Sequence, residues 1–370
     1  MGKEQISALF LTKYSREGAS SRYRFLQYFP FLEANGIACS FSPLTDAKYL
    51  EHLYASGRGN AGDLARSLGR RIGALSTVMK YDVVVVEYEV LPYFPPVFEA
   101  VLKKLRIPLI VNYDDAIFYR YSLHPNPLVK RLLGGKIDSV MRKADLVIAG
   151  NSYLADYAAK AGAGRVEELP TVVDLVRYPG VPGRKNNIFT IGWIGSPSTA
   201  KYLKEIAPAL AEICKGDRAK LRLIGSGPVE LPGIPVDVQP WSEETEVAEL
   251  ESCDAGIMPL YDGLWEQGKC GLKLIQYMAC GLPVVVSDVG MNSQLVQDGV
   301  NGFLARDNDD WIRGLSALRD DLALRQRMGQ AGRKIAEAGY SLQTAAPRLE
   351  MLIRQVVTDA RSARADGKKS

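Results

Sequence analysis

Two lysines lie in a glycine-rich turn before an apolar helix in the stretch GKCGLKLIQYMACGLPVVVSDVG, residues 268–290. Lys269 and Lys273 are four residues apart, so the spacing predicts one shared helical face. Lysine charge is unfavourable at a helix N-terminus, and an anionic ligand there would offset it. A solvent-exposed lysine pair is the weaker alternative. The predicted anion contacts are Gly268, Lys269, Gly271, Leu272 and Lys273.

Two further loops follow apolar strands and begin helices. GSPSTAKYLKE supplies Gly195, Ser196, Ser198 and Lys201, and SREGASSRYRF supplies Gly18, Ser20, Ser21 and Arg22. Free backbone N–H groups at a helix start suit a phosphate or a sugar hydroxyl. A strand–helix turn capped by serine is the alternative, and it is favoured for the second loop taken alone. Neither loop matches the dinucleotide or Walker signatures.

Carboxylates follow two strands of the first half. Asp114 and Asp115 end the strand PLIVNYD, and we expect one of them to face a ligand and to orient a hydroxyl or act in catalysis. Capping of the next turn is an equal alternative. Glu87 and Glu89 are interpreted either as acceptor contacts or, preferably, as ion-pair partners of Arg22 or Arg24. Trp241 is a candidate for stacking on a base or a sugar.

Length and composition bound the function. A chain of 370 residues predicts two domains, and 47% hydrophobic with 24% charged residues predicts an ordered protein. The net charge of +4 is too mild to indicate a nucleic-acid partner. Five scattered cysteines and two histidines give no zinc-ligand spacing and fit a reducing compartment. No signal peptide or membrane span is expected, so the predicted location is cytoplasmic.

Apolar, β-branched runs alternate with helical stretches in both halves of the chain. This pattern predicts an α/β fold with two Rossmann-like domains that face each other across a cleft, with ligand sites at the carboxyl ends of the strands. The predicted parts are an N-terminal domain (1–175), a C-terminal domain (186–340), a helix packing back on the first domain (341–357) and a disordered tail (358–370).

Two successive stretches resemble the nucleotide-sugar site of retaining glycosyltransferase family 4, which has the GT-B fold. They are GKCGLKLIQYMACGLPVVVSDVG and LVQDGVNGFLA. ASSRYR, YDDAIF and GWIGSPSTAKYL resemble a bacterial subgroup of that family. The resemblance implies sugar transfer from a nucleotide donor, held mainly by the second domain, to an acceptor held mainly by the first. It also implies no metal or other cofactor, and front-face attack in which the leaving diphosphate helps to take the acceptor's proton.

The chain departs from the family pattern at several positions. Two glutamates eight positions apart are replaced by Gly268 and Gln276, of which Gln276 retains hydrogen-bonding capacity toward a ribose hydroxyl. Whether Glu266 replaces the missing glutamate is left open. Trp193 stands in place of a diphosphate-binding arginine, and Lys201 is displaced from the usual lysine. We therefore infer that Lys269 and Lys273 supply part of the missing positive charge.

These observations predict a retaining glycosyltransferase of bacterial polysaccharide or glycoconjugate synthesis. A nucleotide-sugar epimerase on the same scaffold and a non-catalytic glycosyltransferase-like partner are the alternatives. The residues do not specify the donor sugar, the base, the acceptor, the linkage or the oligomeric state.

A basic, amphipathic segment in the first half suggests where an acceptor is met. A saccharide or lipid-linked acceptor is expected, and this segment is predicted to contact an anionic membrane peripherally. Packing of an ordinary amphipathic helix on its own domain is the default alternative. The cations of the segment are Arg58, Arg66, Arg70, Arg71 and Lys80, and its apolar positions are Leu64, Leu68, Ile72 and Leu75.

Overall fold

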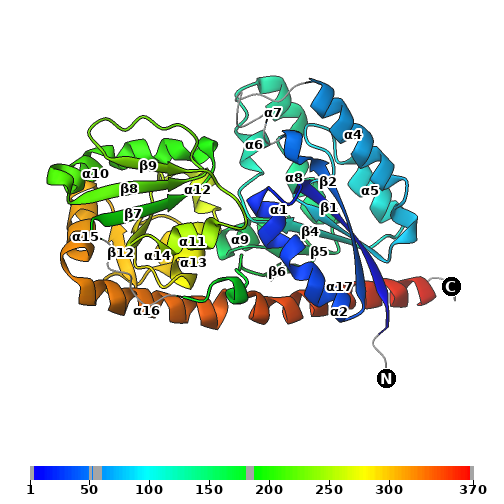
Figure 1. Ribbon diagram of the computed structural model, residues 1–370. Coiled ribbons are helices and arrows are strands. Elements are labelled where there is room, and N and C mark those ends of the chain that lie inside the picture. Colours follow the sequence, from blue (N-terminus) through cyan, green and yellow to red (C-terminus); the bar gives the residue numbers. More distant parts are fainter. Residues whose placement is uncertain (1–3, 50–51, 53–60, 181–186, 367–370) are drawn as a thin grey trace. The chain divides into compact units, whose positions relative to one another are not determined.

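The computed structural model describes residues 4–49, 52, 61–180 and 187–366. The chain divides into two compact units, each built around one six-stranded parallel sheet (Figure 1). Unit 1 comprises Met1–Thr171, Gly268–Cys270 and Leu342–Ser370, and unit 2 comprises Val172–Gln267 and Gly271–Ser341. The predicted class, two Rossmann-like α/β domains, is confirmed.

The sheet of unit 1 has the strand order β2-β1-β3-β4-β5-β6. The strands are β1 (Ile6–Tyr14), β2 (Ile37–Thr45), β3 (Val83–Glu87), β4 (Leu109–Tyr113), β5 (Leu146–Ala149) and β6 (Val166–Glu168). Every residue of β3, β4 and β5 is buried, because helices cover both faces of a parallel sheet. Their continuous apolar runs made these strands predictable.

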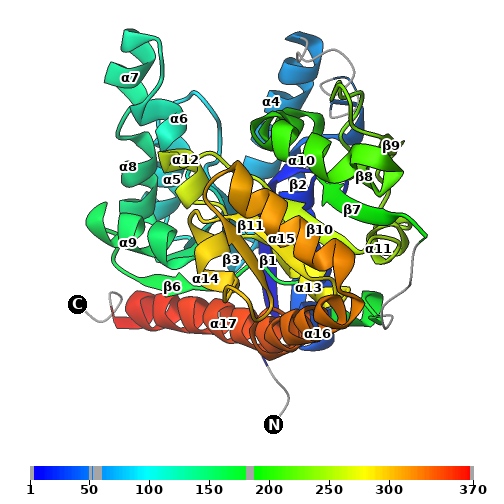
Figure 2. The same cartoon turned by 90° about the vertical axis from the view of Figure 1, so that its left-hand side faces the viewer.

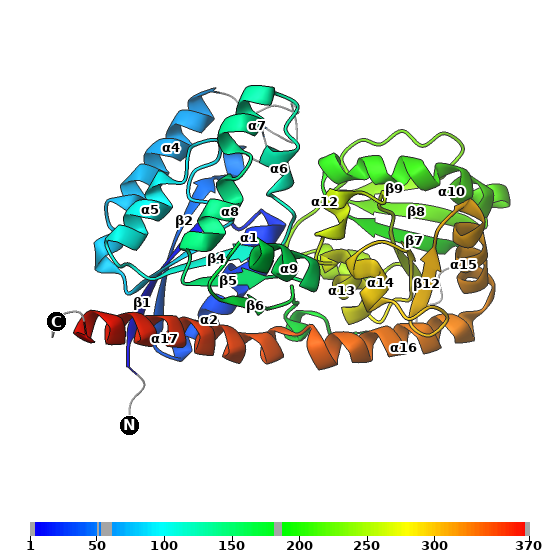
Figure 3. The ribbon, with the colours of Figure 1, turned by 180° about the vertical axis from the view of Figure 1, so that it is seen from behind.

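Helices of unit 1 connect successive strands. They are α1 (Ala19–Arg24), α2 (Phe29–Ala34), α4 (Ala61–Leu75), α5 (Val97–Lys104), α6 (Tyr119–Ser122), α7 (Pro127–Leu133), α8 (Lys136–Lys143) and α9 (Ser152–Lys160). The helical region between β1 and β2 is interrupted, since α1 ends at Arg24 and α2 begins beside Pro30. The view from behind shows α5 beside α8 (Figure 3), and the two helices are in contact.

The last helix, α17 (Leu342–Asp366), covers the end of unit 1 where the strands begin (Figure 3). Arg354 donates to the carbonyl oxygens of Glu4 and Asn35, and Arg361 pairs with Asp82 at 2.8 Å. Arg364 donates to the carbonyl oxygen of Arg106, and the helix continues to Asp366, so the expected disorder from residue 358 is not observed among the described residues. Residues 367–370 lie outside them.

The basic segment predicted for membrane contact is only partly as expected. Arg66 pairs with Asp63 and Arg70 pairs with Asp46, whereas Arg71 is 1% exposed and donates to the carbonyl oxygen of Thr12. Arg71 therefore does not belong to an exposed basic face, and Ile72, expected to pack, is 55% exposed. Arg58 and the side chain of Leu64 lie outside the described residues.

The sheet of unit 2 has the strand order β12-β11-β10-β7-β8-β9. The strands are β7 (Phe189–Ile194), β8 (Ala219–Ile224), β9 (Val236–Gln239), β10 (Ala255–Met258), β11 (Val284–Ser287) and β12 (Gly302–Ala305). Its helical segments are η4 (Pro197–Ile206), α10 (Ala207–Cys214), α11 (Glu246–Glu251), α12 (Leu264–Gln267), α13 (Leu272–Ala279), α14 (Met291–Leu295), α15 (Asn308–Asp320) and α16 (Leu322–Gly339). Figure 2 shows α15 crossing this unit near α10, and the two helices bury one core with the sheet.

Candidate functional site

The carboxyl end of β7 brings together a lysine, a tryptophan and a glycine in unit 2. The Nζ atom of Lys273, in the first turn of α13, lies 4.0 Å from the ring centroid of Trp193. A Cβ atom added to Gly195 would lie 2.6 Å from that Nζ atom and 2.8 Å from Thr199 Oγ1. Only glycine therefore lets the ammonium group approach the backbone here. A partly exposed cation at a strand end is suited to an anionic ligand.

A second lysine lies on the helical segment that follows β7. Lys201 is exposed, and its Nζ atom lies 5.2 Å from the Tyr202 ring centroid and 5.8 Å from that of Tyr261. At the start of the segment, the hydroxyls of Ser196 and Ser198 lie 2.9 Å apart. Several predicted donor-binding residues thus occupy one end of the sheet, on the loop and helical segment after β7.

Glu266 is placed among the aromatic residues near Lys201. It lies in α12, is 8% exposed, and accepts a 2.5 Å hydrogen bond from the hydroxyl of Tyr202. This bond fixes the carboxylate beside the loop after β10.

Two other predicted donor contacts are placed differently. The indole N–H of Trp241 donates to Glu246 at 2.9 Å, at the end of β9. Gln276 is 3% exposed and donates to the hydroxyl of Tyr178 at 3.1 Å. The amide of Gln276 is thus engaged inside unit 2, whereas Trp241 keeps a half-buried ring.

The start of α13 separates the two lysines. Gly271 caps this helix with a φ of 69°, a left-handed conformation that favours glycine, and the helix begins at Leu272. Lys269 therefore precedes the helix, and the prediction that both lysines share a helical face is wrong. Gly268 and Lys269 belong to unit 1, where the Asn151 amide donates to both carbonyl oxygens at 3.2 Å.

In unit 1, hydroxyl and carboxyl groups gather at the carboxyl ends of β1, β3 and β4. Glu87 is 2% exposed, and its Oε2 atom accepts from the Lys13 N–H at 2.6 Å and from Ser21 Oγ at 2.5 Å. Ser20 Oγ lies 2.7 Å from Glu87 Oε1 and 2.8 Å from Asp114 Oδ2. The hydroxyls of Ser20 and Ser21 thus meet carboxyl groups, which disfavours the predicted phosphate contact at these side chains.

The neighbouring carboxyl groups differ in their partners. Asp114 is half-buried and accepts a hydrogen bond from the Tyr88 hydroxyl, and the φ of Tyr88 is 65°. Asp115 lies 3.9 Å from Lys269 Nζ. Burial raises the pKa of Asp115, and the Lys269 charge opposes this rise. Both aspartates are thus accessible in part, whereas one was expected.

Arg22 and Glu89, two further charged residues of this region, are buried and bound to neighbouring groups of unit 1. Arg22 is 2% exposed and donates to the Arg16 carbonyl oxygen at 3.1 Å. Glu89 forms a buried ion pair with Lys136 at 2.5 Å and accepts from Tyr121. The expected pairing of Glu87 or Glu89 with Arg22 or Arg24 is therefore not what the structure shows.

Sequence reasoning missed the joint role of Ser20, Tyr88 and Glu87. The available signal was the position of each group relative to a strand. The serines follow β1, Glu87 and Tyr88 lie at the end of β3, and Asp114 follows β4. These three strands are neighbours in one parallel sheet. Because carboxyl ends of parallel strands share one edge, these groups had to lie close together.

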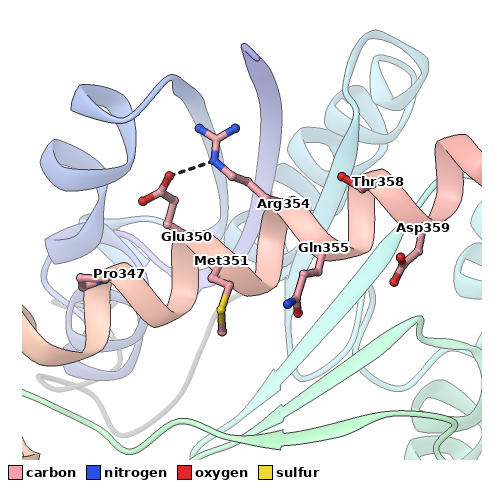
Figure 4. A pocket seen from close by; sticks show the side chains of 7 residues that line it. All are labelled: Pro347, Glu350, Met351, Arg354, Gln355, Thr358 and Asp359. Carbon is pink, nitrogen blue, oxygen red and sulfur yellow. Dashed lines mark hydrogen bonds and ion pairs between the residues drawn. The ribbon is translucent and has the colours of Figure 1, made fainter. Parts of the chain in front are cut away.

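Two surface pockets lie away from these groups. One, of about 340 Å³, runs along α17 (Figure 4), where Arg354 pairs with Glu350 at 2.8 Å. The other, of about 520 Å³, is lined by α16 and by residues preceding β10 and β11. Both lie where strands begin, so neither is our candidate site.

Two kinds of feature are absent from the described ranges. These ranges contain no group of three or more histidine, cysteine or acidic side chains placed to hold a metal ion. Within the same ranges, no helix combines the length and apolar character that crossing a bilayer requires.

Solved structures with the same architecture are two-domain glycosyltransferases. Sucrose-phosphate synthase from Thermosynechococcus elongatus is 15% identical, with a TM-score of 0.71 over 96% of this chain and 100% of that chain. HepE from Anabaena, solved in complex with UDP-glucose, is 17% identical, with a TM-score of 0.70 over 95% of this chain and 100% of that one. The fold is therefore GT-B.

Sequence comparisons agree with the fold. Residues 186–321 match the family described as glycosyl transferases group 1. The D-inositol 3-phosphate glycosyltransferase of Nocardia farcinica is 30% identical over 254 residues, which are 59% of this chain and 53% of that protein. The N-acetyl-alpha-D-glucosaminyl L-malate synthase of Bacillus anthracis is 27% identical over 170 residues, 43% of each chain. The chain thus spans about half the length of these relatives, or less.

The matched region, the relatives and the fold together support similarity to glycosyltransferases of the family 4 type.

Proposed function

We propose that this protein transfers a sugar from a nucleotide-sugar donor to an acceptor hydroxyl with retention of anomeric configuration. The observation that carries the proposal is the Lys273 ammonium group held against Gly195 and Trp193 at the end of β7. A diphosphate there would meet Lys273, with Lys201 as a second nearby cation on the helical segment after β7. The UDP and UDP-glucose complexes of HepE support a nucleotide sugar as donor.

The acceptor is proposed to meet Asp114 and Asp115 of unit 1. In the transfer, the bond between the sugar and the diphosphate breaks while the acceptor oxygen bonds to the same sugar carbon. An aspartate orients the acceptor hydroxyl. The proton of this hydroxyl passes to the departing diphosphate. The names of the relatives, which include inositol phosphate and malate, support a hydroxyl-bearing acceptor. We place the activity in bacterial polysaccharide or glycoconjugate synthesis.

No metal or other cofactor has a step in this proposal, because lysines are assigned to the diphosphate charge. Transfer is expected to continue unchanged in excess EDTA. Loss of transfer in EDTA, with recovery on adding Mg²⁺ or Mn²⁺, would contradict this assignment.

A screen of nucleotide sugars by thermal shift tests the proposed donor. A ligand that binds only the folded state raises the melting temperature. Turnover of a stabilising nucleotide sugar without any acceptor would instead favour an epimerase. Binding with no turnover across a panel of acceptors would favour a non-catalytic partner.

We propose that the protein contacts an anionic membrane peripherally through a surface other than helix α4. The sequence between Ala116 and Ile137 contains no acidic residue, and Lys130 and Arg131 of α7 are exposed. We define the α6–α7 surface as these two cations with three leucines that are 56%, 62% and 70% exposed: Leu123, Leu128 and Leu132. Exposed leucines beside cations without local acids complement an anionic bilayer.

Cosedimentation with vesicles tests this surface. The protein is expected to bind anionic vesicles at low salt and not neutral ones, and Leu128→Ser with Leu132→Ser should abolish binding. Arg66→Ala on α4 is the control, because Arg66 already pairs with Asp63. Undiminished binding by the double variant, or self-association through the leucines, would contradict the proposal.

A further inference from the structure

One serine hydroxyl lies between two carboxyl groups in unit 1. Ser20 Oγ lies 2.7 Å from Glu87 Oε1 and 2.8 Å from Asp114 Oδ2. A hydroxyl carries one hydrogen, so Ser20 can donate to only one of these oxygens. If both carboxyl groups were ionised, the other contact would place oxygen lone pairs and a negative charge against each other at hydrogen-bond distance.

Neighbouring donors do not supply the missing hydrogen. The Tyr88 hydroxyl donates to the other oxygen of Asp114, and it lies 3.2 Å from Ser20 Oγ. The Ser21 hydroxyl accepts from Tyr14 N–H and donates to the far oxygen of Glu87. The Lys13 N–H donates to that same far oxygen. Among the hydrogen bonds of the described residues, no other donor reaches the contact, so the hydrogen belongs to a carboxyl group.

We propose that Glu87, Ser20 and Asp114 hold one proton in common, and that Asp114 is the ionised member. In this arrangement Glu87 Oε1–H donates to Ser20 Oγ, and Ser20 Oγ–H donates to Asp114 Oδ2. Moving both hydrogens one step gives the reverse arrangement, with Glu87 ionised and Asp114 protonated, without gain or loss of a proton. Glu87 is 2% exposed and Asp114 is half-buried, so desolvation favours the proton on Glu87.

Charged and titratable groups from several elements surround the two carboxyl groups. Burial raises the pKa of Glu87, and the Asp114 charge raises it further. Arg71 of α4 interacts electrostatically with Glu87, and Lys13 of β1 lies 5.4 Å from the Tyr88 ring centroid. The groups facing this cluster are Lys13, Arg71, Tyr88, Asp115, Lys269 and Cys270. The cations favour ionisation of one carboxyl group, and burial with mutual repulsion opposes ionisation of the second.

This inference rests on the proposed function for its catalytic meaning. An ionised Asp114 can accept a hydrogen bond from an acceptor hydroxyl, whereas a protonated one would compete as a donor. Glu87 and Ser20 are then positioning residues that keep the charge on Asp114, and they are not expected to touch the acceptor.

Infrared difference spectroscopy of the purified full-length protein tests the shared proton without any activity. The wild type at neutral pH is expected to show a protonated-carboxyl C=O band that is absent from Glu87→Gln and shifted in frequency in Asp114→Asn. Asp115→Asn is the control and should keep the band unshifted, because Asp115 does not contact Ser20. A band absent from the wild type would overturn the proposal. A band that is lost in Glu87→Gln but unshifted in Asp114→Asn would also overturn it, because the protonated carboxyl group would then be independent of Asp114.

The pH profile of transfer provides a second readout if the enzyme is active. The amide introduced by Glu87→Gln would reproduce the neutral, donating form of Glu87, so the acid limb of kcat for this variant should coincide with that of the wild type. If both groups were ionised at neutral pH, removing one charge would instead move the acid limb to lower pH. Loss of transfer with an intact infrared band would contradict the proposed function but not the shared proton.

Discussion

The ammonium group of Lys273 lies 4.0 Å from the ring centroid of Trp193, at the carboxyl end of β7. A cation over an indole face is stabilised by about 0.5–2 kcal/mol, which orients the lysine before any ligand arrives. Trp193 itself is 1% exposed, so the platform is fixed by the core of unit 2. The lysine thus has a defined position on the donor side of the proposed reaction.

Replacing Lys273 by alanine should weaken binding of a nucleoside diphosphate by about 1.5–3 kcal/mol, the scale of a charged hydrogen bond. This corresponds to a roughly 10- to 100-fold rise in Kd, measurable by titration calorimetry. Lys204→Ala is the matched control, since Lys204 is exposed farther along the same helical segment. Equal affinities for wild type and Lys273→Ala would remove the lysine from the site.

Gly195→Ala should lower diphosphate affinity through the same lysine. The new Cβ atom would lie 2.6 Å from Lys273 Nζ and 2.6 Å from the Trp193 ring, too close for these groups to keep their positions, so the lysine and the indole against which it lies should both shift. Gly339→Ala is the control, because a Cβ atom there meets nothing within 4 Å. Full affinity in Gly195→Ala, with an unchanged melting temperature, would show that the lysine position is unimportant.

The variants Asp114→Asn and Asp115→Asn test the roles of the two carboxylates separately. We expect Asp114→Asn to lose transfer while retaining donor affinity, because the proposed donor contacts belong to unit 2. Transfer rates and donor Kd values should be measured side by side. Parallel loss of both, together with a lowered melting temperature, would assign Asp114 a structural role only.

The raised pKa of Glu87 predicts how the stability of the protein depends on pH. This pKa is raised above the ordinary value of 4.5, so the folded state binds more protons than the unfolded state above that pH. The contribution of Glu87 to the free energy of unfolding should therefore be largest below about pH 4.5 and should fall as pH rises through its folded pKa. The wild type should lose stability relative to Glu87→Gln over this range in urea denaturation. A constant difference between the two proteins would contradict the raised pKa.

The fold was largely predictable, and the exceptions have physical causes. Buried strands such as β3 and β11 read as continuous β-branched runs. The edge strand β2 was not predicted because most of its residues are only partly buried or exposed, which admits serine and proline among the apolar residues. The strand β12 was not predicted because its short apolar run, which follows Asn301 and Gly302 and ends before Arg306, resembles a loop.

The candidate site was less predictable than the fold. Lys273 and Asp114 follow strands or begin helices, which sequence patterns locate. Lys269 was misplaced because the helix start depends on the left-handed Gly271, a conformation that the sequence permits but does not require. The bridge from Ser20 to Glu87 and Asp114 joins residues 67 and 94 positions apart, which only the strand order brings together.

The central claim is tested most directly by the product. The nucleotide sugar that stabilises the protein in the thermal-shift screen should be incubated with candidate hydroxyl acceptors, and the glycoside formed should be analysed by NMR. We predict a new glycosidic linkage with the anomeric configuration of the donor, formed in proportion to released nucleoside diphosphate and absent with Asp114→Asn. An inverted product, or conversion of the donor sugar with no linkage to any acceptor, would contradict retaining transfer.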